Sequence, residues 1–565
     1  MRLKKILAIL LTAVLLVSST VIALPVSADG DTTPAWEYKT GTLSGEGTSQ
    51  NPYKINNAQD LATLAYLVNT GANVFENKYV KQTADIDLDN IPWPGIGLNY
   101  DANGTATYAF KGHYNGDNFA IKNLKIDNTY ASDRISFGLF GFVGFAQGGC
   151  KIENINIVSG DITVDSEQYV GALIGRVRNG VTVSNCSNMV PVTVTSAVDA
   201  GAYGGLLGRI EGTTWSLGYV KITNSYNGAN VNVSSTANGN ITVGGICARA
   251  LVVDNTDVTI TMENCLNFGD VSATGSANTK YYEGGVVGRI EKLTTSQTGN
   301  VKIKGAANLG NITLTSASTS SRFGGVMGQL GAGAMGAVVA DCYDSSVLTV
   351  RGYSSEYWNM GLIGEISNSV IIDSNTTKNN YSTNTAYWFK DAAATIDTAT
   401  PDKTWSSKQV GQDNSTDKVV TNSITKSANK KELDLSALSL LSVRGAQYKT
   451  DDDLGLCVRF VGELNLESFA GIKDVGVCVI WGEKTVNVSG SHKLYSSLTQ
   501  MAPDGVITPE GVGYLLAAGV SGVPQNAEIT LSFKPYVEFE DGTIAYGAES
   551  TEITFNNGAY VAPQA

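Results

Sequence analysis

The chain has 565 residues and a formal net charge of −13, and 42% of its residues are hydrophobic. This acidity argues against nucleic acid and anionic lipid surfaces as partners, because proteins bind both through basic faces. The two histidines, His113 and His492, leave almost no material for a Ser/His/Asp triad or a histidine-bound metal.

Residues 1–28 have the pattern of an export signal. Arg2, Lys4 and Lys5 precede a long apolar run, and the small residues that end at Ala28 offer a cleavage site. Removing this segment takes away three of the 39 basic residues and no acidic one, so the formal charge becomes −16. We therefore predict a secreted or cell-surface protein. No later apolar run reaches the ~20 residues that span a bilayer, so we expect no membrane insertion of the mature chain.

Residues 29–95 are predicted to form an N-terminal segment that ends in a helical cap. The sequence Asn57-Ala-Gln-Asp60 precedes an apolar spacing typical of an amphipathic helix, with Asn57 as its cap. A solenoid leaves its terminal coil open, so we expect this helix to cover that end.

Three carboxylates, Asp85, Asp87 and Asp89, alternate with Ile86 and Leu88 and therefore share one face of a predicted strand. A charged outer face or a protected edge explains them. A calcium site is the alternative, although it also needs carbonyl or loop oxygens.

Residues 96–375 are organised by a short glycine phrase that returns seven times. Counted from the last residue of each phrase, the steps are 34, 33, 40, 40, 40 and 36 residues, a period typical of a solenoid. The phrases are Gly138-Leu-Phe-Gly141, Ala172-Leu-Ile-Gly175, Gly205-Leu-Leu-Gly208, Gly245-Ile-Cys-Ala248, Gly285-Val-Val-Gly288, Gly325-Val-Met-Gly328 and Gly361-Leu-Ile-Gly364.

Between the glycine phrases, runs such as Val181-Thr-Val-Ser and Val192-Thr-Val-Thr alternate apolar and polar residues, which indicates strands. We predict three strands in each period and hence one coil of a β-solenoid. If the coils stack in register, equivalent side chains form columns along the axis.

Three such columns can be read from the sequence. Small residues at Cys186, Ser225, Cys265, Ala306 and Cys342 fit a tight inward corner, and asparagines tolerate the left-handed backbone of a corner and can bond to their neighbours above and below. The asparagine columns are Asn185, Asn224, Asn264, Gly305 and Asp341, and Asn188, Asn227, Asn267, Asn308 and Asp344. We expect the glycines of the repeated phrase to mark bends where no Cβ fits.

These phrases resemble the GLUG motif of secreted bacterial surface proteins, many of them adhesins. The upstream stretch Phe110-Lys-Gly-His-Tyr-Asn-Gly116 is similar to the segment that precedes such repeats, and the resemblance covers roughly residues 45–375. Ala248, in place of a glycine, and His113 depart from the pattern. The resemblance implies a right-handed parallel β-helix in an extracellular or cell-envelope setting, and it implies no reaction.

After the last glycine phrase, we predict a C-terminal cap at 376–404, a linker at 405–432 and a β-sandwich domain at 433–565. Asp541-Gly542 is a hairpin signal, and Tyr514-Leu-Leu suggests at most one short helix in this domain. The seven cysteines are odd in number and widely spaced, so we expect buried thiols rather than a disulfide framework, although Cys457 and Cys478 could pair across strands.

One column carries like charges: Arg176, Arg209, Arg249 and Arg289, continued by Gln329 and Glu365. Arginines stacked at this spacing repel by on the order of 0.8 kcal/mol per adjacent pair even in water. Pairing with Glu211 and Glu291 on the same strand face would offset this repulsion. The alternative is a stripe that grips the carboxylates of an acidic glycan.

Aromatic residues recur shortly before the glycine phrases, at Tyr169, Tyr203, Tyr282, Phe323 and Trp358. Such a row packs into the coil or, if exposed, stacks on sugars. We expect a non-enzymatic, adhesin-like binding protein that needs no cofactor and recognises an extracellular glycan or another host or bacterial surface component. The alternatives are a polysaccharide hydrolase or lyase, for which acids such as Glu263, Asp270, Glu283, Glu291, Asp341 and Asp344 are scattered, and a structural spacer.

Overall fold

The computed structural model describes Trp36, residues 43–420 apart from short gaps, and most strand residues between 432 and 561. The predicted export signal at 1–28, Trp358 and Asp341 lie outside the described residues. The gaps before residue 420 are 100–106, 145, 166–167, 196, 213–217, 236–237, 253–257, 277, 293–300, 319, 332–337, 341, 354–360, 367–376, 379–380, 383–384, 395–398, 407–410 and 414–417.

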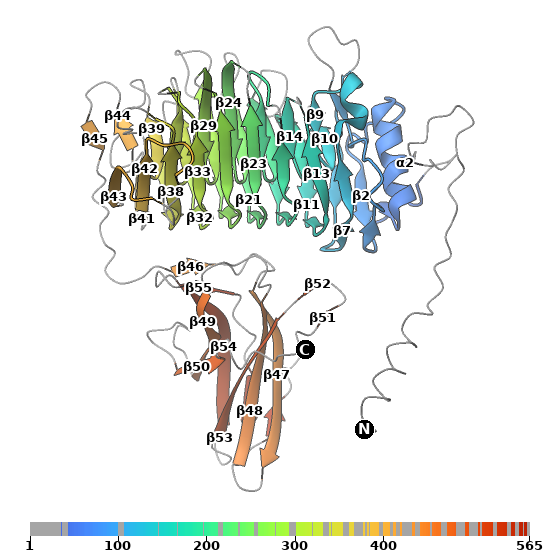
Figure 1. Ribbon diagram of the computed structural model, residues 1–565. Coiled ribbons are helices and arrows are strands. Elements are labelled where there is room, and N and C mark those ends of the chain that lie inside the picture. The colour runs from blue at the N-terminus through green and yellow to red at the C-terminus, as the bar shows by residue number, and fades with distance from the viewer. Residues whose placement is uncertain are drawn as a thin grey trace, which may run out of the picture. The chain divides into compact units, whose positions relative to one another are not determined.

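The predicted N-terminal helix is α2, Ala58–Asn69, and it lies at the end of the solenoid beside β2 in Figure 1. Asn57 caps it, accepting a hydrogen bond from the backbone N–H of Asp60 at 3.0 Å. Its apolar face is fully buried through Leu61, Leu64 and Val68. No helix of the described residues is both long and apolar enough to span a bilayer.

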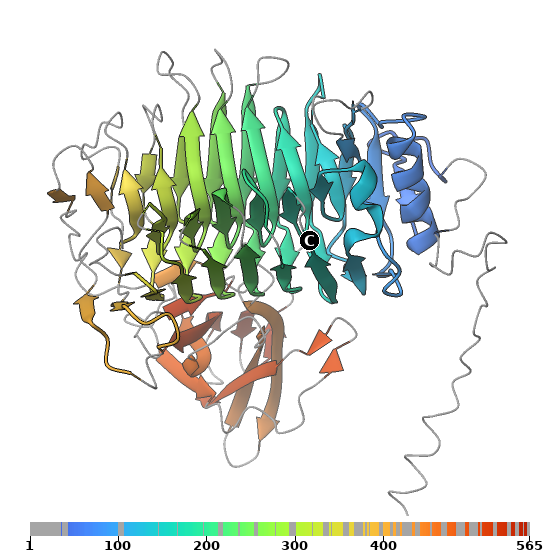
Figure 2. The same ribbon diagram turned by 45° about the horizontal axis from the view of Figure 1, so that its top comes forward.

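The predicted parallel β-solenoid is confirmed, and strands of successive coils lie side by side in rows (Figures 1 and 2). The rows form five sheets, which we number along the coil. Sheet 1 contains β1 (Tyr53–Ile55), β2 (Tyr79–Gln82), β6 (His113–Asn115), β11 (Cys150–Glu153), β16 (Val181–Ser184), β21 (Tyr219–Thr223), β26 (Thr259–Glu263), β31 (Val301–Lys304), β36 (Val338–Ala340) and β40 (Thr377–Lys378).

Sheets 2 and 3 follow in each coil. Sheet 2 consists of short strands: β3 (Ile86–Asp87), β7 (Ala120–Lys122), β12 (Asn156–Ile157), β17 (Ser187–Asn188), β22 (Tyr226–Asn227), β27 (Leu266–Asn267), β32 (Ala307–Asn308), β37 (Tyr343–Asp344) and β41 (Tyr381–Ser382). Sheet 3 consists of β8 (Leu124–Ile126), β13 (Gly160–Val164), β18 (Val192–Val194), β23 (Val231–Ser235), β28 (Val271–Gly275), β33 (Ile312–Thr315), β38 (Val347–Arg351), β42 (Thr385–Phe389) and β43 (Lys403–Ser406).

The glycine phrase separates sheets 4 and 5. Sheet 4 consists of β9 (Ser136–Phe137), β14 (Tyr169–Gly171), β19 (Ala202–Gly204), β24 (Gly239–Gly244), β29 (Thr279–Gly284) and β34 (Arg322–Gly324). Sheet 5 consists of β10 (Phe140–Val143), β15 (Ile174–Arg178), β20 (Leu207–Gly212), β25 (Cys247–Val252), β30 (Val287–Lys292), β35 (Met327–Leu330), β39 (Ile363–Ile366), β44 (Gly411–Asp413) and β45 (Lys418–Val420). A hairpin of β4 (Leu98–Asn99) and β5 (Thr107–Tyr108) and a 3-10 helix, η1 (Asn128–Asp133), lie among the first coils.

The prediction of three strands per period is therefore wrong, because a central coil contains five. The two-residue strands of sheet 2 are too short to show an alternation, so the sequence made them look like turns. The glycine phrase looked like one bend, but it joins two strands, such as β19 and β20, that belong to different sheets.

A buried ladder of side-chain amides runs along sheet 2, as predicted. Asn188 donates to Asn227, Asn227 to Asn267 and Asn267 to Asn308, each at 2.9 Å. Asn308 then donates to Asp344 at 3.3 Å. All five side chains are fully buried. The same amides also donate to a backbone carbonyl two residues ahead, such as Gly269 O for Asn267, so the ladder satisfies both of their N–H groups.

The glycines opposite this ladder are required by space rather than by backbone conformation. A Cβ on Gly245 would lie 2.1 Å from the carbonyl oxygen of Gly285 and 2.3 Å from Cγ of Asn267. Gly285 and Gly325 would clash in the same way with Asn308 and Asp344. None of these three glycines has a positive φ. The prediction that no Cβ fits is thus confirmed, with the amide ladder as part of the reason.

The other two predicted columns are also present. Cys186, Cys265 and Cys342 are buried thiols, as we expected of small inward residues. The corner column adopts the left-handed backbone, with φ of 53° at Asn185 and 62° at Gly305. Ala248, where the pattern has glycine, is fully buried.

The predicted C-terminal cap and linker contain further strands of the solenoid. At 376–404, β42 pairs in parallel with β38, and β43 then pairs antiparallel with β42. Within 405–432, β44 continues sheet 5 by pairing with β39, and β45 turns back on it. The described parts of the predicted linker therefore extend the solenoid to Val420.

Beyond residue 432 the described residues are again strands. One sheet contains β46 (Glu432–Asp434), β55 (Ile544–Tyr546), β54 (Glu528–Phe539), β49 (Ile472–Trp481), β50 (His492–Ser496), β56 (Ile553–Asn556) and β57 (Ala559–Val561). A second sheet contains β47 (Leu441–Asp451), β48 (Gly455–Leu464) and β53 (Tyr514–Val523), and β51 (Ile507–Thr508) pairs with β52 (Gly511–Val512). That the two larger sheets form a sandwich stays a prediction.

Two details of this part bear on the expectations. The strands on either side of Asp541-Gly542, β54 and β55, pair antiparallel as the expected hairpin requires, and the turn itself lies outside the described residues. The short helix suggested at Tyr514 is wrong, because this residue begins the ten-residue strand β53. Cys478 is a buried thiol, and the side chain of Cys457 lies outside the described residues.

The direction of the hydrogen bonds in the ladder predicts which substitutions destabilise the fold. Changing Asn267→Asp replaces a donor of two hydrogen bonds by a second acceptor, so it should destabilise the fold by about 1–3 kcal/mol or more. The matched control is Asp344→Asn at the acceptor end of the ladder, where an amide oxygen can still accept from Asn308, and we expect little change. Denaturant unfolding measures both. Equal losses in the two variants would contradict a directional ladder.

Candidate functional site: the arginine column and its surroundings

The predicted arginine column, Arg176, Arg209, Arg249 and Arg289, exists on sheet 5. Register pairs each arginine with the next one along the sheet, and then Arg289 with Gln329 and Gln329 with Glu365. The guanidinium groups are not displayed to solvent, because the exposed fractions of the four side chains are 10%, 12%, 14% and 20%. An open stripe for a glycan is therefore not what this column forms.

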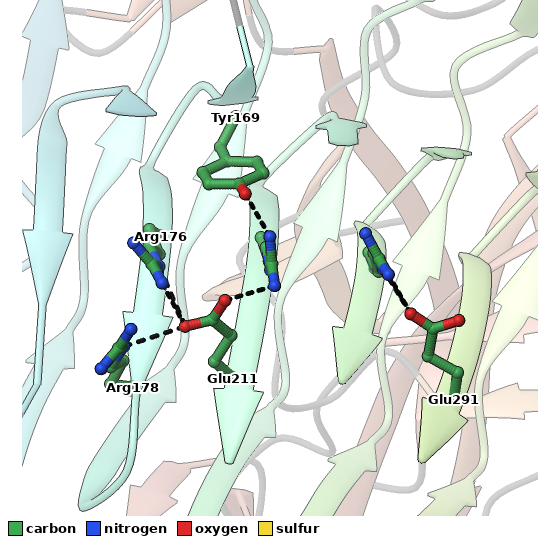
Figure 3. A network of polar contacts seen from close by, with 7 residues as sticks. Tyr169, Arg176, Arg178, Glu211 and Glu291 are labelled. Carbon is green, nitrogen blue, oxygen red and sulfur yellow. Dashed lines mark hydrogen bonds and ion pairs between the residues drawn. The ribbon is translucent and has the colours of Figure 1, made fainter. Parts of the chain in front are cut away.

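Glu211 partly offsets the charge of the first part of the column. It forms ion pairs with Arg176 from the preceding coil and with Arg209 from its own coil. Arg178 adds a third contact, from Nε to the Glu211 carboxylate at 2.9 Å. Figure 3 shows the three guanidinium groups around this one carboxylate. Burial alone would raise the pKa of Glu211, but the three arginines outweigh it and hold the pKa below its usual value.

Glu291 repeats the arrangement two coils later. Arg249 from the preceding coil pairs with it, and Arg289 lies 2.5 Å away. The column then ends in neutral and acidic groups: Arg289 donates to Gln329 at 2.6 Å, and Gln329 donates to Glu365 at 2.6 Å. The structural alternative, in which glutamates offset the stacked arginines, is the one that the geometry supports.

The predicted aromatic row is split between two faces of sheet 4. Tyr169 and Tyr282 face the arginines: the Arg209 guanidinium lies 4.7 Å from the Tyr169 ring centroid and that of Arg289 lies 4.1 Å from Tyr282. Tyr203 belongs to the neighbouring column, is fully buried, and accepts a hydrogen bond from Val198 N at 3.1 Å.

Burial also decides between stacking on sugars and packing. The exposed fractions of Tyr169 and Tyr282 are 5% and 3%, and Phe323 is fully buried. These residues therefore pack, and the sugar-stacking interpretation is wrong for them. The spacing was a usable signal for this split: Tyr169 and Tyr282 lie three residues before their glycine phrases and Tyr203 lies two, and successive residues of a strand point to opposite faces.

Two arginines in this network were missed by sequence reasoning. Arg178 lies two residues after Arg176 and thus on the same strand face, which was a usable signal for its contact with Glu211. Arg322 lies on sheet 4, in register with Tyr282, and pairs with Glu365 on sheet 5. No signal within one strand could have predicted that contact, since it joins two sheets.

The scattered acids proposed for catalysis do not form one site among the described residues. Glu291 is held by arginines, and Asp344 accepts from Asn308 and from Ser346. Glu263 is the last residue of β26 in sheet 1, whereas Asp270 directly precedes β28 of sheet 3. Glu263 lies 3.8 Å from Lys221 on the surface.

Glu283 is the unusual acid. It is fully buried on β29, between Val243 and Phe323 in neighbouring coils, and neither carboxylate oxygen has a hydrogen-bond partner. Burial raises its pKa well above the usual value. The protonated form is therefore the one that this site accommodates.

Two of the three calcium candidates, Asp85 and Asp87, are engaged with protein groups through their carboxylates. Asp85 pairs with Lys122 at 2.7 Å and accepts from Ala120 N at 2.9 Å. Asp87 accepts from Asn123 at 2.8 Å and from the N–H of Asp89 at 2.9 Å. Among the residues that the structure describes, no group of three or more His, Cys, Asp or Glu side chains is placed to hold a metal.

The chain is similar to two known protein sequences over part of its length. It is 34% identical over 132 residues to a protein of Evansella cellulosilytica named as a Gly-rich membrane protein, and 31% identical over 177 residues to halomucin of Haloquadratum walsbyi. The matches cover 23% and 30% of this chain but only 14% and 2% of those proteins. No protein-family model and no solved structure matches. The solenoid and these two relatives are compatible with a cell-surface protein.

Breaking the shared carboxylate should be costly. Glu211→Gln leaves three arginines in a buried site without their counter-charge, so we expect a loss of about 3–5 kcal/mol in the free energy of unfolding. Glu263→Gln is the control, because its exposed pair with Lys221 is worth at most about 1 kcal/mol. Since the pKa of Glu211 is lowered on folding, its contribution is present near neutral pH and is lost as pH falls through the folded pKa. Equal losses in both variants at pH 7 would contradict this account.

Removing the buried acid should stabilise the protein. Glu283→Leu should raise the free energy of unfolding by about 1–3 kcal/mol, since it replaces an unsatisfied polar group by an apolar one. In the unfolded chain Glu283 loses its proton near its usual pKa of about 4.3, while the folded chain keeps it, so wild-type stability should fall as pH rises above that value. Melting temperatures between pH 5 and 8 measure this slope.

The variant Glu283→Gln separates the two effects of Glu283. It should abolish the contribution of this site to the pH slope but retain much of the cost of a buried polar group. An unchanged slope in both variants would show that the carboxyl group is not its source.

Proposed function

We propose that the chain is a secreted or cell-surface β-solenoid of the GLUG-repeat type, which binds an extracellular ligand through an outer sheet face and catalyses no reaction. The observation that carries this proposal is the mutual satisfaction of the buried columns. Asparagines bond to asparagines, and arginines pair with glutamates of their own or the next coil. These groups are committed to holding the coils, so ligand recognition belongs to the outer faces of the sheets.

The outer face of sheet 3 supports carbohydrate, or a comparable polar surface component, as the class of ligand. Thr193, Asn232, Ser272 and Thr313 follow one another in register and are partly exposed. Ser272 donates to Asn232 across coils at 2.8 Å, which orders the row. Short hydroxyl and amide groups in a regular array match the hydroxyl groups of sugars, because both sides donate and accept hydrogen bonds.

The setting is argued from two independent observations, and the buried thiols do not oppose it. The N-terminal sequence has the pattern of an export signal. The two partial relatives are named as a membrane protein and as halomucin. The thiols Cys186, Cys265 and Cys342 are fully buried, and their stacked positions give them a packing role that needs no disulfide.

The test is a glycan array probed with the mature chain, run beside a screen for release of reducing ends from the same polysaccharides. We expect retention on at least one class of polysaccharide without turnover. Retention with turnover would replace the proposal by a polysaccharide-active enzyme. If neither retention nor turnover is observed while circular dichroism shows that the solenoid is folded, the remaining interpretation is a structural spacer.

A further inference from the structure

The outer face of sheet 1 carries a second regular column. Register aligns Tyr79, His113, Lys151, Thr182, Lys221, Thr261 and Lys302 across successive coils. We call these seven residues the lysine column. They lie on the outward side, since Ile152, Val183 and Ile222, one position further along each strand, are fully buried.

The lysines of this column recur in every second coil, with a threonine between them. Because neighbouring strands lie about 4.8 Å apart, Lys151, Lys221 and Lys302 are spaced by roughly 10 Å. All three side chains are exposed, and among the described residues Lys151 and Lys302 form no ion pair. The partly exposed hydroxyl groups of Thr182 and Thr261 stand between the charges.

The charge of this face contrasts with that of the chain. From β6 to β31, the outward residues of sheet 1 include four lysines, the fourth being Lys304, and two acids, Glu153 and Glu263. Glu263 partly offsets Lys221, at 3.8 Å. The face therefore carries a net positive charge on a chain whose formal net charge is −13. Such a local sign reversal favours an anionic partner that follows the column.

The N-terminal end of the column is aromatic. The Tyr79 side chain is 38% exposed, and its ring lies 4.5 Å from that of His113. Burial and the neighbouring Lys151 lower the pKa of His113, so its imidazole is neutral at pH 7. An exposed tyrosine ring held in place by a second ring is suited to packing against the apolar C–H face of a pyranose.

We propose that the lysine column binds a linear acidic polysaccharide that carries one anionic group on every second sugar, and this assignment rests on the binding function proposed above. An extended disaccharide has nearly the length of two coils. Each lysine then meets one anionic group, and each threonine meets the neutral sugar between two anionic ones. The aromatic end receives a sugar ring by stacking.

The spacing argues against nucleic acid as the partner. A DNA strand carries one phosphate about every 3.4 Å, roughly three times the density of the lysines. The remaining acidic surface would repel such a dense polyanion, whereas a sparsely charged polysaccharide needs few contacts and is repelled less.

The test uses the mature chain and three probes of similar length: hyaluronan, which alternates a uronic acid with a neutral amino sugar; polygalacturonate, charged on every sugar; and neutral dextran. The variant Lys151→Gln/Lys221→Gln/Lys302→Gln removes the column's charge. The control variant Lys125→Gln/Lys390→Gln/Lys473→Gln removes the same charge from surface lysines elsewhere. Affinity is measured by calorimetry at 50 and 200 mM salt.

We expect wild type to prefer hyaluronan over both other probes and to bind it less tightly at 200 mM salt. The column variant should lose at least tenfold in affinity and most of that salt dependence, while the control variant changes by less than threefold. Both should keep the wild-type melting temperature, because the substituted side chains are on the surface. Equal affinities in the column variant and the control variant would overturn the assignment.

A gain-of-function variant tests the spacing itself. Thr182→Lys/Thr261→Lys places a lysine in every coil from Lys151 to Lys302 and should shift the preference toward polygalacturonate. An unchanged preference would overturn the match between charge period and coil height. Binding of wild type to dextran alone would sink the lysine column and leave the proposed function standing, and no binding to any polysaccharide here or on the array would sink both.

Discussion

The amide ladder on sheet 2 is the interaction on which the solenoid depends. Its hydrogen bonds join one coil to the next at a fixed spacing, and the side chains have no access to water that would replace those bonds. The glycines opposite follow from it, because Gly245 and Gly285 have room for a hydrogen atom and not for a methyl group. Register in the other sheets is then set, since a shift in one wall would break the bonds in another.

Stacking equivalent residues of successive coils brings like charges close together. The chain reduces this repulsion by arranging its charged residues with a period of two coils. On sheet 5, Glu211 and Glu291 lie two coils apart and each serves an arginine from its own coil and one from the coil before. On sheet 1, the lysines lie in alternate coils, and a threonine occupies the same position in the coil between them. The inner column offsets part of its charge with buried glutamates, whereas the outer column spaces its charges apart. The outer charges thus stay available for a partner.

Much of this architecture can be predicted from the sequence, because a repeated phrase constrains every coil at once. The spacing of the glycine phrases predicted the solenoid, and the alignment of Asn188, Asn227 and Asn267 predicted the ladder. The burial of the arginines could not be predicted in this way. A strand's alternation shows which residues share a face, but it does not show that sheet 4 covers that face of sheet 5 with Tyr169 and Tyr282. For the same reason, candidate binding residues that looked exposed belong to the packing.

The ladder has a polarity that bears on how such a protein changes length over generations. Each asparagine from Asn188 to Asn308 donates a hydrogen bond to the side chain in the next coil, so the ladder still closes when whole coils are duplicated or deleted. The arginine column keeps its glutamates only when such coils are gained or lost in pairs. Asp344 ends the run of amides, and its side chain accepts from Asn308 and from Ser346. Recombination can therefore lengthen the solenoid upstream of Asp344, and this one residue marks where the amide ladder ends.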